Sequence, residues 1–207
     1  MKFEDVDAYL HRVTPKRDRT QAAMESYARK NDFPIIGPLV GRFLYQMALA
    51  TKAKNILELG SGYGYSAYWF ARATGSKGRI IMTDADDNNC RRAFQYFEQG
   101  KLQARLDYMV GDALDLAGQL DGPFDIILND IDKEDYPKVI NVAARLLKPG
   151  GLFITDNIIW SGRVFNSASK DASTRAVKAF TKKLYADRRF FTTVLPLRDG
   201  IAVATRL

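Results

Sequence analysis

Short apolar runs alternate with helical patterns through the middle of the chain. The runs lie at 55–59, 79–83, 105–110, 123–129 and 151–155. Between several of them, apolar residues recur with helical spacing, at 65–73, 88–99 and 135–147. Strands that alternate with helices predict a parallel sheet with helices on both faces. Nearly uninterrupted apolar runs are typical of strands that are buried on both sides.

The two ends of the chain carry different patterns. Helical patterns come first, at 4–13, 17–30 and 38–51, and a last helix is expected at 171–186. Two strand-like segments, 189–197 and 200–207, are joined by Arg198-Asp199-Gly200, and Asp-Gly favours a hairpin. We therefore predict an α/β fold whose mostly parallel, seven-stranded sheet ends in an antiparallel hairpin. The expected units are a helical extension over 1–35 and one domain over 36–207.

Composition narrows the chemistry. The 207 residues include one Cys and one His, which excludes an internal disulfide and nearly excludes a thiolate or imidazole metal site. Any metal would need oxygen ligands. No apolar run approaches the ~20 residues of a membrane span, and the N-terminus is too acidic for a secretory signal, so we expect a cytoplasmic protein without a membrane partner.

The net charge of +7 is unevenly distributed. Basic residues are in excess over 1–54 and 163–207, whereas 55–162 is acidic on balance. A basic surface could attract nucleic acid, but a solvated basic face that aids solubility explains the same pattern.

Polar residues gather where the predicted strands end. In open α/β sheets, ligands bind at the carboxyl ends of the strands. After the first strand, Gly60-Ser61-Gly62 permits a tight turn and a close approach of the backbone to a ligand. Such a loop also fits a nicotinamide-cofactor fingerprint. Glu58 argues against a pyrophosphate, because a carboxylate would repel phosphate and attract a cation.

The next two strand ends carry single acids. Asp84 is placed to accept hydrogen bonds from both hydroxyls of a ribose, although it could instead cap a helix, as could Asp86 or Asp87. Asp112 could accept a hydrogen bond from an adenine amino group or cap the following helix.

Asp130 and the pair Asp156-Asn157 follow the fourth and fifth predicted strands. If these strands are parallel neighbours, two carboxylates and an amide oxygen converge at one edge of the sheet. This set of hard oxygen ligands suits Mg²⁺ or Ca²⁺. The alternative is that each residue caps a helix or loop.

Several of these motifs, taken in order, identify a family. The segments ELGSGYGYSA, GDA, NDIDKEDY, LLKPGG, DNIIWSGRV and RDGIAVATRL resemble the cation-dependent O-methyltransferases of the catechol and caffeoyl-CoA type. The resemblance covers roughly 36–207 and implies a Rossmann-like, class I methyltransferase fold. NDIDKEDY together with DNIIWSG is its most specific part. The N-terminal residues match no part of the family pattern, and an insertion that the plant enzymes use for substrate recognition is missing.

The resemblance also implies roles for individual residues. Asp130, Asp156 and Asn157 match the ligands of a divalent cation, for which Mg²⁺ is favoured over Ca²⁺ or Mn²⁺. Lys133 matches a lysine beside the reacting hydroxyl, so Lys133 and Asp130 are the expected catalytic residues. Trp160 and Phe33 are expected to contact the substrate. The expected contacts of the cofactor, S-adenosylmethionine (SAM), are Glu58, Gly60, Ser61, Tyr63, Ser66, Asp84, Ala85, Asp112, Ala113, Asp130 and Asp132.

The implied reaction is transfer of a methyl group from SAM to a hydroxyl of a small vicinal-diol aromatic, by a homodimer. Two other functions remain open at this stage. Some bacterial relatives methylate hydroxyuridine in tRNA, and the basic C-terminal flank could contact phosphates. A non-catalytic or NAD-binding module would share the fold, although Glu58 and the paired acids speak against it.

Overall fold

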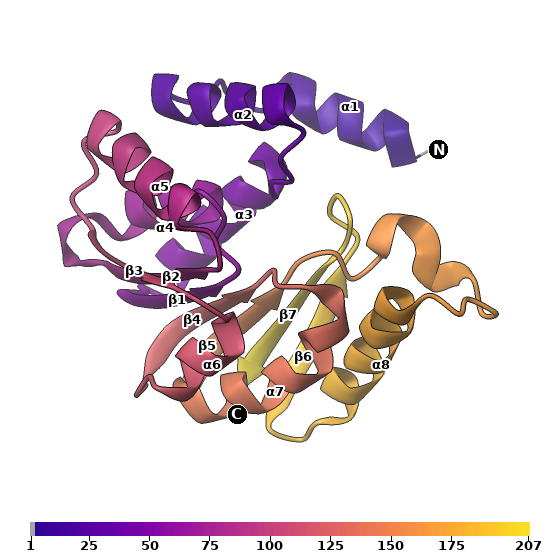
Figure 1. The fold of residues 1–207 in the computed structure, drawn as a ribbon. Helices are drawn as coiled ribbons and strands as arrows, with labels where there is room; N and C mark the ends of the chain where they lie inside the picture. Colours follow the sequence, from indigo (N-terminus) through magenta and orange to yellow (C-terminus); the bar gives the residue numbers. More distant parts are fainter. Residues whose placement is uncertain (1–2) are drawn as a thin grey trace.

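The computed structural model describes residues 3–207, and side chains from Asp5 onwards. Its centre is a seven-stranded sheet in the order β3-β2-β1-β4-β5-β7-β6 (Figure 1). Strand β7 is antiparallel to both of its neighbours, and the other pairs are parallel. The mostly parallel sheet with a C-terminal antiparallel hairpin is therefore confirmed. The strands are β1 (Asn55–Leu59), β2 (Arg79–Asp84), β3 (Arg105–Val110), β4 (Phe124–Asn129), β5 (Leu147–Thr155), β6 (Phe190–Leu195) and β7 (Ile201–Arg206).

Helices cover both faces of this sheet (Figure 1). One face carries α3 (Gly37–Ala50), α4 (Tyr65–Thr74) and α5 (Asp87–Gln99), and outside them lie α1 (Phe3–Val13) and α2 (Arg19–Asn31). The other face carries α6 (Ala113–Gly118), α7 (Tyr136–Leu146) and α8 (Ala172–Ala186). No helix among residues 3–207 is long and apolar enough to cross a membrane.

Alternate strand residues enter two separate cores. Ile56 and Ile154 pack in the core beneath α3 and α4, whereas Leu57 and Phe153 pack in the core above α7 and α8. All four side chains are fully buried. Because both faces need apolar side chains, the strands lack the alternation of a half-exposed sheet, which explains their sequence pattern.

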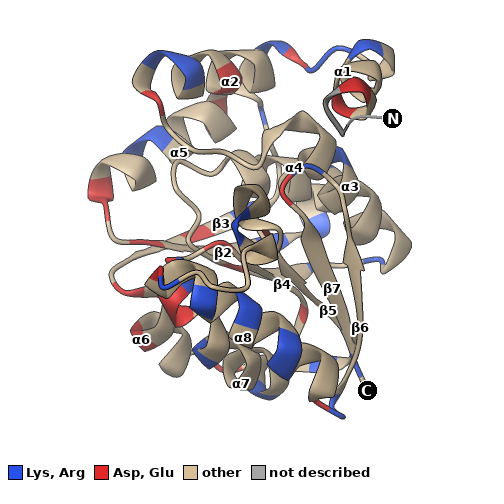
Figure 2. Ribbon diagram, turned by 90° about the vertical axis from the view of Figure 1, so that its right-hand side faces the viewer, with Lys and Arg blue, Asp and Glu red and all other residues tan. Residues whose placement is uncertain are grey.

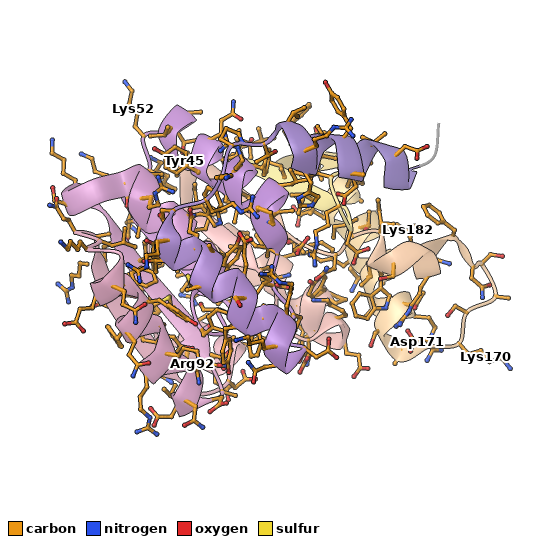
Figure 3. All side chains as sticks on the ribbon, turned by 90° about the horizontal axis from the view of Figure 1, so that it is seen from above. Tyr45, Lys52, Arg92, Lys170, Asp171 and Lys182 are labelled. Carbon is orange, nitrogen blue, oxygen red and sulfur yellow. The ribbon has the colours of Figure 1, made fainter. Side chains whose placement is uncertain are left out.

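Helix α2 is attached directly to the loop that follows β1. The Tyr63 hydroxyl donates to the carbonyl oxygen of Met24 at 2.9 Å. The buried Glu25 carboxylate accepts two hydrogen bonds from Arg17 and one from the Tyr65 hydroxyl, each of 2.8 Å. Figure 3 looks down on α2 and shows Arg92 of α5 beside it. The division into an extension over 1–35 and a domain over 36–207 stays a prediction.

The sequence pattern was wrong about the start of β5. It placed 148–150 between a helix over 135–147 and a strand over 151–155, but α7 ends at Leu146 and these residues belong to β5. The pairing with β4 shifts register between Phe124 and Ile126, and Gly150 has a φ of 77°. An irregularity in β5, where five residue steps oppose two on β4, thus accommodates a Lys-Pro-Gly-Gly segment that alone is typical of a turn.

Candidate active site

A cavity of about 860 Å³ opens at the carboxyl ends of the parallel strands. It lies where the strand order changes direction, between β1 and β4, which is the usual ligand position in such sheets. Every predicted site residue except Glu58 lines it. Those residues are Phe33, Gly60, Ser61, Tyr63, Ser66, Asp84, Ala85, Asp112, Ala113, Asp130, Asp132, Lys133, Asp156, Asn157 and Trp160.

The loop after β1 approaches the loop after β4 so closely that it requires a glycine. Gly60 has a φ of 81°, and a Cβ atom there would lie 2.5 Å from the carbonyl oxygen of Asp130. Gly62 packs beneath the ring of Phe33, and the Tyr108 hydroxyl donates to its carbonyl oxygen at 2.7 Å. Phe33 therefore lies on the side of the cavity formed by this loop.

The acids at the ends of β2 and β3 are held differently from each other. Asp84 accepts hydrogen bonds from the backbone N–H groups of Gly62 at 3.0 Å and Asp86 at 2.9 Å and from Asn89 Nδ2 at 3.0 Å. Asp86 caps α5, and Asp84 supports that start of the helix without capping it. Asp112 does cap α6, with one oxygen accepting from two backbone N–H groups at 2.9 Å. The capping role foreseen for Asp112 is thus real, and its second oxygen is left for the cavity.

Glu58 lies within β1, beneath the glycine loop, and is fully buried. Neither of its carboxyl oxygens makes a hydrogen bond within the described structure. Burial raises the pKa of this carboxyl to about 8, against the lowering influence of the nearby Ser66 and Ser61 hydroxyls. A buried carboxyl of this kind ionises readily only if a cationic group binds nearby.

Lys133 and Asp130 form a close pair at the end of β4. Lys133 Nζ donates to Asp130 Oδ1 at 2.9 Å, and its side chain is only 11% exposed. The ammonium lies 5.0 Å from the centre of the Tyr136 ring and 5.5 Å from that of the Trp160 ring. Burial raises the pKa of Asp130, although Lys133 opposes this effect. The pair therefore combines a half-buried carboxyl with a shielded ammonium in one wall of the cavity.

Asp156 follows β5 and is 1% exposed. Burial, together with the Asp130 carboxylate, raises its pKa to about 7. Its Oδ2 makes no hydrogen bond among the described residues, and the closest cation is Arg198 Nη1 at 3.5 Å. A buried carboxyl with an unpartnered oxygen, its pKa raised by a second carboxyl beside it, fits the requirements of a cation site.

Asn157 adds an amide oxygen to this pair. Its backbone is left-handed, with φ 60°, and its Nδ2 donates to Asp199 Oδ2 at 3.0 Å. A carboxylate can only accept, so the amide nitrogen must face Asp199 and the amide oxygen is left free of that bond. Within residues 3–207 no three His, Cys, Asp or Glu side chains are grouped for a metal ion. A set of three oxygen ligands at this position therefore needs the Asn157 amide oxygen in addition to the Asp130 and Asp156 carboxyls.

The sequence did not point to Arg198 or Asp199 as site residues. Arg198 lines the cavity, and Asp199 holds Asn157 and the backbone N–H of Ser161. The Arg-Asp-Gly segment was recognised only as a turn. Its position beside Asp156 depends on the antiparallel pairing of β7 with β5, which places Ala202 opposite Thr155.

Residues 19–207 match the model of a family described as O-methyltransferase. The chain belongs to the O-methyltransferase family. The match begins before the predicted boundary at residue 36 and includes α2. It identifies the chain as an enzyme of the SAM-dependent O-methyltransferase class, as the sequence resemblance implied, and it removes the non-catalytic and NAD-binding alternatives.

Two relatives can be aligned with most of this methyltransferase chain. A catechol O-methyltransferase of Niastella koreensis is 33% identical, over 98% of this chain and 96% of its own. A catechol O-methyltransferase of Mycobacterium tuberculosis is 32% identical, over 84% of this chain and 80% of its own.

Solved structures of O-methyltransferases have the same fold as this chain. The O-methyltransferase TomG of Streptomyces achromogenes, in complex with SAM, superposes with a TM-score of 0.89 at 27% identity, over 100% of this chain and 99% of its own. An O-methyltransferase of Bacillus cereus, in complex with SAH, gives a TM-score of 0.88 at 29% identity, over 98% of this chain and 97% of its own.

Proposed function

We propose that this chain is a divalent-cation-dependent O-methyltransferase that methylates a hydroxyl of a small, catechol-like vicinal diol. The observation that carries the proposal is the buried Asp156 carboxyl beside the half-buried Asp130, in which Asp156 Oδ2 has no hydrogen-bond partner among the described residues. The names of the catechol O-methyltransferase relatives support the same substrate class.

We assign the two ends of the cavity to two ligands. SAM would occupy the end lined by the glycine loop, with Ser66 at its carboxylate, Asp84 at its ribose and Asp112 at its adenine. Asp132, which is exposed and lines the cavity, would accept from the amino group of the cofactor. The remaining cofactor contacts are those predicted from the sequence, and they stay predictions.

Asp130, Asp156 and the amide oxygen of Asn157 would hold the cation, preferably Mg²⁺. When bound, SAM supplies an electrophilic methyl group, and a divalent cation lowers the pKa of a hydroxyl that it contacts. Both adjacent oxygens of a vicinal diol can reach one cation, which fixes the acceptor relative to the protein.

Lys133 is the residue that would take the proton. Its Nζ, at the cavity wall next to Asp130, would relay the proton of the acceptor hydroxyl: the ammonium would pass one of its protons to solvent and take up that of the hydroxyl as the new O–C bond forms and the S–C bond breaks. Trp160 would flank the aromatic ring of the acceptor, since it lines the cavity beside Lys133. The described part of the chain would thereby supply a proton relay, a planar contact and three oxygen ligands at one edge of the sheet.

A comparison of positional isomers tests this function. The purified protein, supplied with SAM and Mg²⁺, should methylate catechol much faster than resorcinol or hydroquinone, whose hydroxyls are not adjacent. Equal rates for the three isomers would contradict chelation of a vicinal diol. A parallel reaction with bulk tRNA covers the nucleic-acid alternative, for which basic residues on α8 offer a surface (Figure 2). Transfer to tRNA and not to catechol would favour that alternative.

Two further expectations, a homodimer and a cytoplasmic location, stay predictions. Sedimentation equilibrium of the purified chain would test the first directly: a mass close to twice 23.3 kDa is expected, and a mass of one chain would contradict it.

A further inference from the structure

Arg198 presents an uncommitted guanidinium to the cavity. It lies in the connection between β6 and β7, lines the cavity and is 41% exposed. Its one ion pair among the described residues is the 3.5 Å contact with Asp156 Oδ2, which is too distorted for a hydrogen bond. A guanidinium carries five N–H donors. At the cavity wall these donors have no hydrogen bond to another described residue, and they are available to a ligand.

The backbone around Arg198 is held by hydrogen bonds, so the position from which its side chain extends is fixed. The carbonyl oxygens of Asp199 and Gly200 accept from the N–H groups of Ile159 at 2.8 Å and Ile158 at 3.0 Å. Gly200 has a φ of 82°, and a Cβ atom there would lie 2.6 Å from Ile159. The turn is thus held against the segment that follows Asn157, and Arg198 projects from it into the acceptor end of the cavity.

The Arg198 side chain passes the start of α3 before its guanidinium reaches the cavity. Its Cδ and Nε atoms lie 3.8 Å and 3.7 Å from the position of a Cβ atom on Gly37. The guanidinium is therefore bracketed by the Gly37 backbone on one side and by Asp156 on the other. This position is distinct from that of Lys133, which is tied to Asp130 at 2.9 Å and is largely shielded.

The single ion pair of Arg198 indicates what it would bind. Without a cation, Arg198 and Lys133 offset the charges of Asp130 and Asp156. A divalent cation on these two carboxylates would compete with Arg198 for Asp156 Oδ2 and release the guanidinium from that contact. Asp199, the acid beside it in the turn, accepts from Asn157 and Ser161 and makes no ion pair with Arg198. An anion carried by the acceptor would then pair with the guanidinium.

We propose that Arg198 binds a carboxylate on the acceptor, so that the preferred substrates are vicinal-diol aromatic acids. This inference rests on the proposed function, in which the cation and Lys133 hold the diol. A planar guanidinium matches a carboxylate with two parallel hydrogen bonds, which an ammonium or an amide cannot reproduce. Arg198 therefore favours vicinal diols that carry a carboxylate over those that do not, and the cation site favours vicinal diols over other phenols.

The test compares one acid with its ester in matched variants. Values of kcat/KM are measured for 3,4-dihydroxybenzoate and for its methyl ester at saturating Mg²⁺ and SAM. The readout is the ratio of the acid to the ester, because changes in folding, cation affinity or cofactor affinity affect both substrates and cancel. Arg198→Gln removes the charge, Arg198→Lys keeps it without the planar fork, and Arg188→Gln removes a charge from an exposed residue at the opposite end of β6.

Arg198→Gln is expected to lower the ratio by at least about tenfold, the usual worth of a hydrogen bond to a charged group. Arg198→Lys should lower it less, and Arg188→Gln should leave it at the wild-type value. An unchanged ratio in Arg198→Gln, or an equal fall in Arg188→Gln, overturns the inference while the proposed function stands. If Arg198→Gln does not fold, the ratio of Arg198→Lys decides alone. If the wild-type protein methylates neither diol, the proposed function itself fails.

Discussion

Glu58 provides a sharp physical test, because its burial has opposite consequences for stability and for cofactor binding. Its carboxyl is fully buried without a hydrogen bond to any described residue, and its pKa is raised from 4.5 to about 8. One pKa unit equals about 1.36 kcal/mol, so ionising this group in the ligand-free protein costs roughly 5 kcal/mol at most. The variant Glu58→Gln keeps the shape and removes the charge.

The direction of the pH dependence follows from proton linkage. Between pH 4.5 and about pH 8 the folded protein binds the Glu58 proton more tightly than the unfolded chain does. The contribution of Glu58 to the free energy of unfolding is therefore greatest below pH 4.5, falls as the pH rises through this window, and is constant above it. Glu58→Gln lacks this contribution, so its stability relative to wild type should increase with pH, by up to roughly 5 kcal/mol.

Urea denaturation of ligand-free wild type and variant, from about pH 5 to about pH 9, measures this difference. Glu98→Gln, an exposed change on α5, is the matched control and should give no trend. SAM affinity, in contrast to stability, should fall in Glu58→Gln. The dissociation constant should rise about tenfold, because a carboxylate that attracts the cationic cofactor is lost. A stability difference that does not change with pH would refute the assignment of a raised pKa to Glu58.

Three further variants test the cation site and the loop beside it. Asp156→Ala should abolish turnover and Mg²⁺ binding in calorimetry, yet leave SAM affinity within a few-fold; a large loss of SAM affinity would make Asp156 a cofactor ligand. Asp199→Asn should weaken Mn²⁺ binding about 10- to 100-fold in paramagnetic resonance titrations, because an amide can also donate and no longer fixes the orientation of Asn157. Gly60→Ala should lower the free energy of unfolding by about 1–3 kcal/mol in urea denaturation, since its Cβ would meet the Asp130 carbonyl at 2.5 Å.

Asp121→Asn is the control for these three variants. Asp121 is exposed and precedes β4, so it lies at the end of the sheet opposite the cavity. Its stability, SAM affinity and cation affinity should match those of the wild-type protein. A Gly60→Ala protein as stable as this control would contradict the close approach of the two loops.

The order of elements and the cavity residues were accessible from the sequence because both depend on local patterns. Apolar runs such as 55–59 and 151–155 mark doubly covered strands, and a polar residue directly after each run must lie at the ligand-binding edge of the sheet. This reasoning located Asp84, Asp130 and Asp156 before any coordinates.

Features that depend on distant pairing were not accessible in this way. Lys148-Pro149-Gly150-Gly151 has the local chemistry of a turn, and only pairing with β4 makes it part of a bulged strand. Arg198 gives no signal of its own, since its approach to Asp156 follows from the register of β7 against β5. For Asp112 the structure shows the capping alternative, through one carboxyl oxygen, and the contact with adenine stays a prediction.

Dependence of methyl transfer on a divalent cation tests the central claim most directly. Transfer of a labelled methyl group from SAM to catechol would be followed after EDTA treatment and again as Mg²⁺ is added back. The oxygen ligands proposed on Asp130, Asp156 and Asn157 predict that EDTA abolishes transfer and that added Mg²⁺ restores it with saturation. Undiminished transfer in the presence of EDTA would contradict the proposed role of these residues.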